Sequence, residues 1–450
     1  MVESVLKERV ASIATGRGRK TLGCSGKAAG IECEKPSVSG AVSQRACVFC
    51  GARVVLNPIT DAFHIIHGPI GCASYTWDIR GSLTSKGELY RNSYSTDLGE
   101  LDIVFGGEKR LAAAIEQAVE REHPKVVFVY ATCIVGVIGD DVEAVCRDAE
   151  QRFGIRVIPV MAPGFSGTKS QGYRLAGEAI MRLIRPHYTP DAEPLAAVNF
   201  LGDFNLAGET WIVRRYLEQL GVPSLTSITG DSHYDSLIRA PRAALNLVQC
   251  AGSMVALARQ MQEEFHIPFQ RVSFYGIEDT SNSLIETARH FGPEATRRAR
   301  EFVEEETARL WPLVETYRER LAGKCAAIYV GGGFKAISLI RQFAELGVGV
   351  GMVGTQTGQP EDYEIIRDIV GPETVVLDDA NPAELEKFMR EQHVDILVGG
   401  VKERPLAYKL GVAFCDHNHE RKHPLAGFIG VENFAREIAD SLLSPVWRLL

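Results

Sequence analysis

Short runs of aliphatic and β-branched residues alternate with amphipathic segments of helical period through most of the chain. The apolar run at 125–130 has strand length, and the segment 141–153 after it has the spacing of an amphipathic helix. The pair recurs as the run at 157–160 and the helical segment at 172–184. This alternation predicts a parallel sheet with helices packed on its faces.

The same alternation restarts twice further along the chain. An apolar run at 196–202 precedes a helical segment at 210–220, and a long charged helical region at 294–321 precedes apolar runs at 325–331 and 395–399. We therefore expect an α/β fold of three doubly wound, Rossmann-like domains with parallel sheets around a central cofactor cleft, because such domains bind ligands at the carboxyl ends of their strands. The expected divisions are a flexible N-terminal arm at 1–40 and domains at 41–194, 195–324 and 325–450.

The composition excludes several classes of function. The 450 residues carry a formal net charge of -8, with 45% hydrophobic and 24% charged residues. This gives no basic surplus for nucleic acid, no apolar run long enough to span a membrane, and no signal peptide at the N-terminus. We expect a cytoplasmic protein without nucleic-acid or membrane partners, in which most cysteines ligate metal or pack in the core rather than form disulfides.

Three cysteines in the first third of the chain stand at strand ends or in Gly/Pro turns, namely Cys47, Cys72 and Cys133. Thiolates are soft ligands that select iron–sulfur clusters, zinc or copper. The alternative is that a cysteine serves as a small core residue, and we assign that role to Cys146 on a helix face and to Cys325 at the start of a strand.

The remaining cysteines are less informative on their own. Cys47 and Cys50 form a C-x-x-C, which fits a redox or zinc site, but no second C-x-x-C completes a zinc ribbon. Cys24 and Cys33 lie in the predicted arm, where a free thiol is expected. Cys250 stands far down the chain, directly after the apolar stretch 245–249.

Five blocks of sequence, in order along the chain, resemble the nitrogenase component-1 superfamily. Within it the chain is most similar to the α-type subunits, which include catalytic subunits and scaffolds for cofactor assembly. The blocks are His64–Trp77, Asp102–Leu111, Ile138–Asp141, Asn246–Cys250 and Ser444–Trp447.

The resemblance implies two kinds of metal cluster. Cys47, Cys72 and Cys133 match the α-side ligands of a P-cluster-type [8Fe-7S] cluster shared with a β-type partner chain. Cys250 matches the thiolate that binds a terminal iron of a large carbide-type Fe–S cofactor, either the iron–molybdenum cofactor or a precursor of it. One thiolate and one nitrogen at opposite ends suffice to orient such a cofactor in a rigid cavity.

Other residues of that cofactor pocket are implied by position. Arg80 matches an arginine that lines it, and Lys402 matches a lysine near its organic acid; without the motif both would be solvated charges. The far-end ligand has three candidates: counting from either side places His417 or Asn418 at the family's histidine, and His419 stands beside them. A polar, solvated turn is the alternative for this segment.

The chain departs from the dinitrogen-reducing subunits at the reactive face of the cofactor. Tyr173 replaces a histidine there, and Lys169 stands near the place of a glutamine. Without that imidazole, dinitrogen reduction is not expected. We therefore name Lys169, Tyr173 and Arg80 as candidate catalytic residues for another substrate, with His67 as a further candidate proton donor.

Two functions follow from the resemblance, and they are close in weight. The favoured one is the α-type subunit of a nitrogenase-like reductase, which takes electrons from an ATP-dependent iron protein and cleaves a C–S bond as methylthio-alkane reductases do. The alternative is a scaffold on which the iron–molybdenum cofactor matures. Both imply an α2β2 heterotetramer with a β-type chain. A plain α/β protein that binds a nucleotide or metabolite leaves the cysteine positions unexplained.

Overall fold

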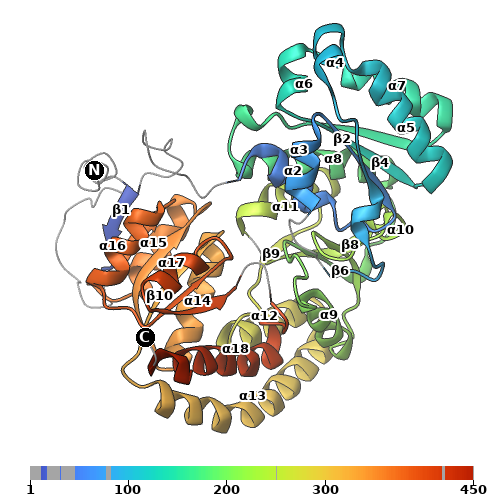
Figure 1. Ribbon diagram of the computed structural model, residues 1–450. Helices are drawn as coiled ribbons and strands as arrows, with labels where there is room; N and C mark the ends of the chain where they lie inside the picture. The colour runs from blue at the N-terminus through green and yellow to red at the C-terminus, as the bar shows by residue number, and fades with distance from the viewer. Residues whose placement is uncertain are drawn as a thin grey trace, which may run out of the picture. The chain divides into compact units, whose positions relative to one another are not determined.

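The buried apolar runs form the strands of three sheets, and the amphipathic segments form the helices around them (Figure 1). The computed structural model describes residues 12–17, 31, 46–77, 83–249, 251–417 and 421–448. The α/β class and the parallel sheets are confirmed. The chain divides into two compact units: one holds residues 46–271, and the other holds the described residues before them together with those from Val272 onward.

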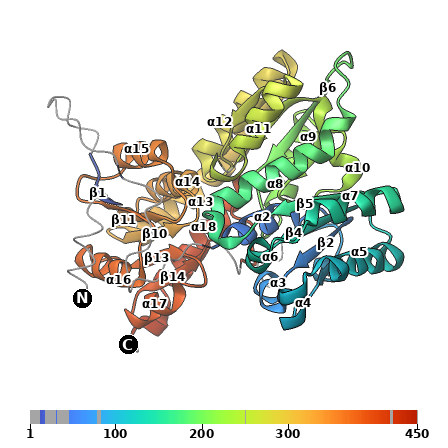
Figure 2. The ribbon, with the colours of Figure 1, turned by 90° about the horizontal axis from the view of Figure 1, so that it is seen from above.

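The first sheet is fully parallel and has the order β3-β2-β4-β5. Helices α2 and α8 cover one face of this sheet, and α5 and α7 cover the other (Figure 2). Alternate side chains of its strands enter the two cores under these helix pairs. The strands are β2 (Ala62–His67), β3 (Ser93–Ser95), β4 (Val126–Ala131) and β5 (Arg156–Met161), and the helices are α2 (Val48–Leu56), α5 (Glu108–Glu122), α7 (Val142–Phe153) and α8 (Lys169–Ile184).

The register of this sheet decides where its loops meet. His67 pairs with Ala131, so β2 and β4 end level with each other. The short helices α3 (Ile70–Trp77) and α6 (Cys133–Ile138) therefore start side by side at the carboxyl edge of the sheet. A third short helix, α4 (Glu100–Phe105), has no buried residue.

Helices α2 and α8 cross at two glycines. A Cβ at Gly172 would stand 2.0 Å from the carbonyl oxygen of Val48, and a Cβ at Gly51 would stand 2.2 Å from that of Lys169. Real Cβ atoms do not approach so closely, so the crossing requires glycine at both positions. The backbone at the start of α2 is thereby held firmly against α8.

The second sheet belongs to the same unit and has the parallel order β7-β6-β8-β9. Its helix α11 shares a core with α8 of the first sheet. The strands are β6 (Leu195–Leu201), β7 (Ser224–Ile228), β8 (Ala243–Val248) and β9 (Phe269–Arg271), and the helices are α9 (Glu209–Gln219), α10 (Tyr234–Leu237) and α11 (Ala251–Phe265).

The third sheet has the order β1-β12-β11-β10-β13-β14 and changes direction of winding between β10 and β13. All of its pairs are parallel except that of β1, which is antiparallel to β12. The strands are β1 (Ile13–Thr15), β10 (Cys325–Val330), β11 (Gly349–Thr355), β12 (Val375–Asp378), β13 (Ile396–Gly399) and β14 (Ala413–Asp416). Strand β1 lies inside the stretch 1–40 that we expected to be a flexible arm.

Helices of the third sheet's unit include the predicted charged helix, which is the long α13 (Figure 1). Residues 272–324, assigned from the sequence to the second domain, lie in this unit because α12 and α13 pack against α18. The helices are α12 (Ile277–His290), α13 (Pro293–Leu321), α14 (Gly333–Glu345), α15 (Pro360–Ile369), α16 (Pro382–Glu391), α17 (Arg404–Lys409) and α18 (Gly427–Leu442).

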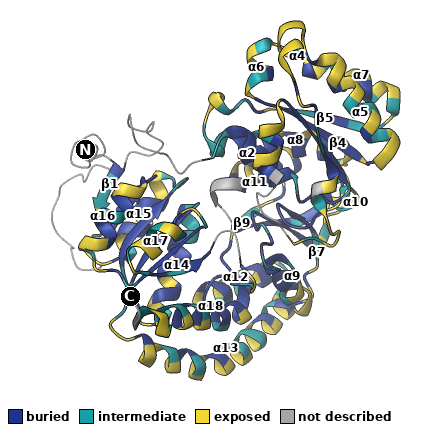
Figure 3. Cartoon of the chain, viewed as in Figure 1, coloured by how far each residue is buried: buried dark blue, intermediate teal, exposed yellow. Residues whose placement is uncertain are grey.

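Most strand residues are buried, except in the short β1, β3 and β9, and exposed residues lie mainly on the outer helix faces (Figure 3). Within the described part of the chain, no helix combines the length and apolar character needed to cross a membrane.

Candidate metal-cluster site

The three turn cysteines all stand at helix starts. Cys47 is the N-cap of α2, Cys72 is the third residue of α3, and Cys133 is the first residue of α6. A cysteine at a helix start lies beside backbone N–H groups that have no partner within the helix. Cys133 is exposed and the other two are half-buried, so all three sulfurs are within reach of a metal.

Gly164 lies between two of these sulfurs. Its backbone N–H donates a hydrogen bond to Sγ of Cys133 at 3.0 Å. A Cβ at Gly164 would stand 3.0 Å from Sγ of Cys133 and 3.7 Å from Sγ of Cys47, so both sulfurs border the space that its missing side chain leaves. An isolated antiparallel bridge between Cys47 and Thr168 holds this loop beside α2.

The pKa of the third thiol, that of Cys72, depends on the other two cysteines. Burial raises the pKa of the Cys72 thiol, the negative charges of Cys133 and Cys47 raise it further, and a hydrogen bond with Thr132 lowers it. Three thiolates in one place repel each other unless cations lie among them. Among the described residues, no three His, Cys, Asp or Glu side chains are close enough to hold a single metal ion. Thiolates are soft ligands, which iron–sulfur clusters, zinc and copper take in preference to hard cations.

Lys169 and Tyr173, the candidate catalytic pair, lie on the first turns of α8. The ammonium of Lys169 is 5.7 Å from the centre of the Tyr173 ring, a cation–π contact. Tyr173 is buried and belongs to the core under α2 and α8. The structure thus brings the two together, with the lysine half-buried above the ring.

His417 follows β14 in the other unit and is fully buried. Neither of its ring nitrogens has a hydrogen-bond partner among the described residues. Burial, together with the charges of Lys335 and Arg421, holds the pKa of His417 well below its usual value, so the imidazole is neutral. A neutral imidazole with unused nitrogens is the state that binds a metal.

The backbone and ring of His417 are fixed by their surroundings. Its N–H donates to the carbonyl of Gly399, and its own carbonyl accepts from Nζ of Lys335 at 2.7 Å. The ring lies 5.5 Å from that of Tyr275 and 6.3 Å from that of Phe434. These contacts place it at the carboxyl edge of the third sheet, next to the change of winding between β10 and β13.

Lys402 is exposed in the turn after β13. Its neighbour Glu403, which sequence reasoning missed, is buried, and burial raises its pKa to about 7. One carboxylate oxygen accepts from the N–H of Gly400 at 2.8 Å, and the other has no hydrogen-bond partner among the described residues. The only signal in the sequence was the Gly-Gly turn that precedes it.

The predicted ligand Cys250 and the candidates Arg80, Asn418 and His419 lie outside the described residues, as do Cys24 and Cys33. Cys146 is buried, and burial raises the pKa of its thiol to about 12, which confirms it as a core residue. Cys50 is buried in the first turn of α2.

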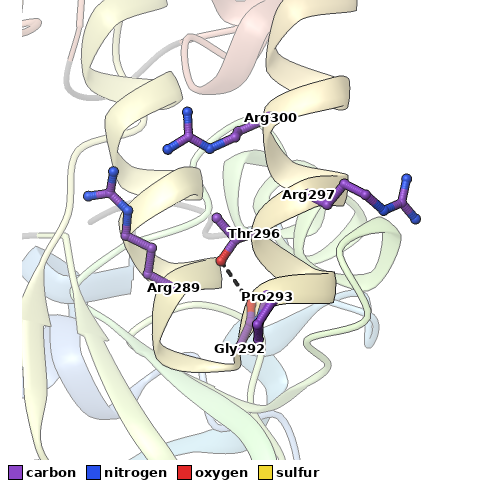
Figure 4. A pocket seen from close by; sticks show the side chains of 6 residues that line it. All are labelled: Arg289, Gly292, Pro293, Thr296, Arg297 and Arg300. Carbon is purple, nitrogen blue, oxygen red and sulfur yellow. Dashed lines mark hydrogen bonds between the residues drawn. The ribbon is translucent and has the colours of Figure 1, made fainter.

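A cavity of about 480 Å³ lies where α12 meets α13, far along the chain from these cysteines (Figure 4). Three arginines line it, but Arg297 pairs with Glu294 and Glu301, and Arg289 pairs with Glu286. Arg297 also points away from α12 (Figure 4). Two of the three arginines that line this cavity are therefore ion-paired.

The cysteines, the parallel sheets and the blocks of sequence define one class of protein. The model of the family described as "Nitrogenase component 1 type Oxidoreductase" matches residues 47–443. The chain therefore belongs to this family. The solved chain "Nitrogenase Cp1 at pH 5" superposes with a TM-score of 0.90 at 30% identity, covering 100% of this chain and 97% of that one.

Two relatives that match nearly the whole chain share the same name. The chain is 60% identical to the "Nitrogenase iron-molybdenum cofactor biosynthesis protein NifE" of Clostridium pasteurianum, over 98% of this chain and 96% of that protein. It is 50% identical to the protein of the same name from Methanosarcina barkeri, over 98% and 99%.

These relatives correct the favoured function. The expectation of a catalytic reductase subunit that cleaves C–S bonds is wrong, because relatives along the whole chain carry the name of a cofactor biosynthesis protein, which fits the alternative.

Proposed function

We propose that this chain is the α-type half of a scaffold that holds a precursor of the iron–molybdenum cofactor while it matures. The observation that carries the proposal is 60% identity over 98% of the chain to a cofactor biosynthesis protein. The chain then does not turn over a substrate, and its oxidoreductase fold serves to hold and charge-balance clusters. The domain limits 41–194, 195–324 and 325–450 remain part of the proposal, except that residues 272–324 pack in the unit of the third sheet.

We assign the permanent cluster to Cys47, Cys72 and Cys133, as the α-side ligands of a P-cluster-type [8Fe-7S] cluster. Such a cluster, when bound, accepts and releases single electrons. The protein's part is to supply thiolates at helix starts, a backbone N–H from Gly164 to one sulfur, and a space with no side chain between two of them. The arrangement of these described residues supports the assignment.

The remaining side of that cluster is assigned to a β-type partner in an α2β2 heterotetramer. Cys133 is exposed on α6, and Val137 on the same helix is 70% exposed. Leu101, Val104 and Phe105 of the neighbouring α4 are likewise exposed. A large apolar surface beside a metal ligand supports burial by another chain. An ATP-dependent iron protein is the proposed electron donor.

We assign the precursor to Cys250 at one end and a nitrogen of the 417–419 segment, with His417 first, at the other. The imidazole of His417 is neutral and has no hydrogen-bond partner among the described residues, which supports this choice. Lys402, Arg80 and Lys169 are proposed to balance the negative charge of the bound precursor. The cation–π contact with the ring of Tyr173 helps to position Lys169.

The test uses the full chain purified anaerobically with its β-type partner. Cys250→Ala is expected to lose the iron of the precursor and its transfer to apo-nitrogenase, while Cys72→Ala loses the electron paramagnetic resonance signal of the permanent cluster. Cys146→Ala, which removes a buried core thiol, is the control and keeps both. Unchanged iron in Cys250→Ala and Cys72→Ala would reject the proposal, as would turnover of a methyl thioether with iron protein and ATP.

A further inference from the structure

His67 is the last residue of β2 and its ring is fully buried with both nitrogens engaged. Nε2 lies 3.0 Å from Oδ2 of Asp140, and Nδ1 lies 3.0 Å from Oγ1 of Thr96. Burial lowers the pKa of His67, so the ring is neutral and has one N–H. A carboxylate can only accept, so Nε2 donates to Asp140 and the Thr96 hydroxyl donates to Nδ1.

This network reaches the loop of Cys72. The N–H of Gly68 donates to Oγ1 of Thr96 at 3.0 Å, and the carbonyl of Gly68 accepts from the N–H of Leu98 at 3.1 Å. Gly68 opens the turn into α3, where the N–H of Cys72 donates to the carbonyl of Pro69. The start of the Cys72 loop is therefore tied to the same threonine that the ring of His67 contacts.

The network also holds α6, the helix of Cys133, at both ends. At its start, the N–H and hydroxyl of Thr132 donate to the carbonyl of His67 at 3.2 and 2.9 Å. At its end, Asp140 accepts from the ring of His67 and from the N–H of Gly107 at 3.1 Å. A Cβ at Gly107 would stand 2.9 Å from Cε1 of His67, so this fit needs glycine.

Helix α6 needs such support. It has six residues, and only Val135 of these is buried. A helix of this length is not stable on its own, so the position of Cys133 has to be imposed by its neighbours. His67 supplies both attachments, through its carbonyl to Thr132 and through its ring to Asp140. Neither Thr132 nor Asp140 is a proposed metal ligand.

We propose that His67, with Asp140 and Thr132, is a positioning residue that fixes Cys133 against Cys72 for the permanent iron–sulfur cluster. The inference rests on the proposed function, which supplies the cluster. It replaces the proton-donor role that the sequence suggested for His67. Residues around the ligands of a metal site commonly change its affinity by about tenfold or more when removed.

The test compares paired variants in the anaerobic complex with the β-type partner. Asp140→Ala and Thr132→Val are expected to lower retention of the cluster's iron by about tenfold and to change its electron paramagnetic resonance signal. The conservative Asp140→Asn and Thr132→Ser keep a hydrogen bond and are expected to restore most of both. Ile115→Val, a change at a buried core residue of α5, is the control for stability alone: it lowers the melting temperature and leaves the signal unchanged.

A readout without iron tests the geometry itself. In the apo chain, a short bifunctional thiol reagent is expected to join Cys47 to Cys133 in the wild type and several-fold more slowly in Thr132→Val. Thr132→Val removes one hydroxyl at nearly constant volume. That hydroxyl also bonds the Cys72 thiol, but Cys72 takes no part in this cross-link, so the variant carries the test even if Asp140→Ala does not fold.

These experiments distinguish failure of the positioning role from failure of the proposed function. A normal signal and normal cross-linking in Asp140→Ala and Thr132→Val, with the signal lost in Cys72→Ala, would overturn the positioning role alone. A normal signal in Cys72→Ala as well would overturn the proposed function on which it rests.

Discussion

The backbone N–H of Gly164 donates to Sγ of Cys133 across 3.0 Å, and the missing side chain of Gly164 leaves the space between that sulfur and the sulfur of Cys47. The two residues are 31 positions apart, at the ends of neighbouring strands β4 and β5. A loop backbone thus shapes a site whose ligands come from three helix starts.

Gly164→Ala is expected to reduce cluster retention by about tenfold without unfolding the chain, because a methyl group enters the space between the two sulfurs. Iron content and electron paramagnetic resonance of the complex measure the effect. The control is Gly177→Ala on α8, whose Cβ would make an ordinary 3.5 Å contact with Leu257. Equal iron in both variants would contradict the prediction.

Gly172→Ala is expected to destabilise the chain by about 3 kcal/mol, because its Cβ would stand 2.0 Å from the carbonyl of Val48 and would force α2 and α8 apart. Denaturant unfolding of the apo chain measures the loss. Gly177→Ala, on the same helix but with room for its methyl group, should change stability by less than about 1 kcal/mol in either direction. A similar stability for the two variants would show that the helices can separate without penalty.

The half-buried Glu345 makes stability depend on pH. Its two carboxylate oxygens accept from the N–H groups of Ile277 and Glu278 at the start of α12, and burial raises its pKa to about 7. An acid whose pKa is higher in the folded state binds more protons there, so its contribution is complete below pH 4.5 and is lost as pH rises towards 7. The loss amounts to up to about 3 kcal/mol.

Glu345→Gln isolates this contribution, because the amide has no titration and its oxygen still accepts from α12. Between about pH 5 and 7.5, the free energy of unfolding of the wild type should fall relative to that of the variant. Urea unfolding at several pH values gives both curves. Parallel curves would mean that Glu345 has an ordinary pKa.

His417→Phe is expected to stabilise the apo chain by about 1 kcal/mol and to weaken precursor binding. The change removes two buried nitrogens that have no hydrogen-bond partner among the described residues, and the ring can keep its contacts with Tyr275 and Phe434. Thermal unfolding and iron content test the two effects. A loss of more than about 1 kcal/mol would contradict the prediction, since it would mean that those nitrogens are satisfied.

Periodicity in the sequence was sufficient to predict the sheets, because strands such as β4 and β10 are buried on both faces and read as unbroken apolar runs. It could not predict β1, whose three residues are too few to show a period and whose partner β12 lies about 360 positions away. The assignment of α12 and α13 failed for a similar reason, because packing on α18 is invisible to local patterns.

The cysteines could be singled out by their place in turns, but the groups that arrange them could not. Gly164 and Thr132 act through contacts of 3.0 and 2.9 Å with atoms distant in sequence. Glycine and threonine are common in turns for other reasons. The choice between reductase and scaffold could not be made from ligands at all, since both need the same ones.

Strand β1 has a practical consequence for handling the protein. By pairing with Val375, Val376 and Leu377 it occupies the backbone groups along one edge of β12, and Arg17 ties it down through Asp368. An uncovered edge of this kind recruits strands from other molecules and leads to aggregation. A shortened version that lacks the first twenty residues would therefore expose the unpaired edge of β12 and aggregate more readily. Solubility trials should retain the N-terminus.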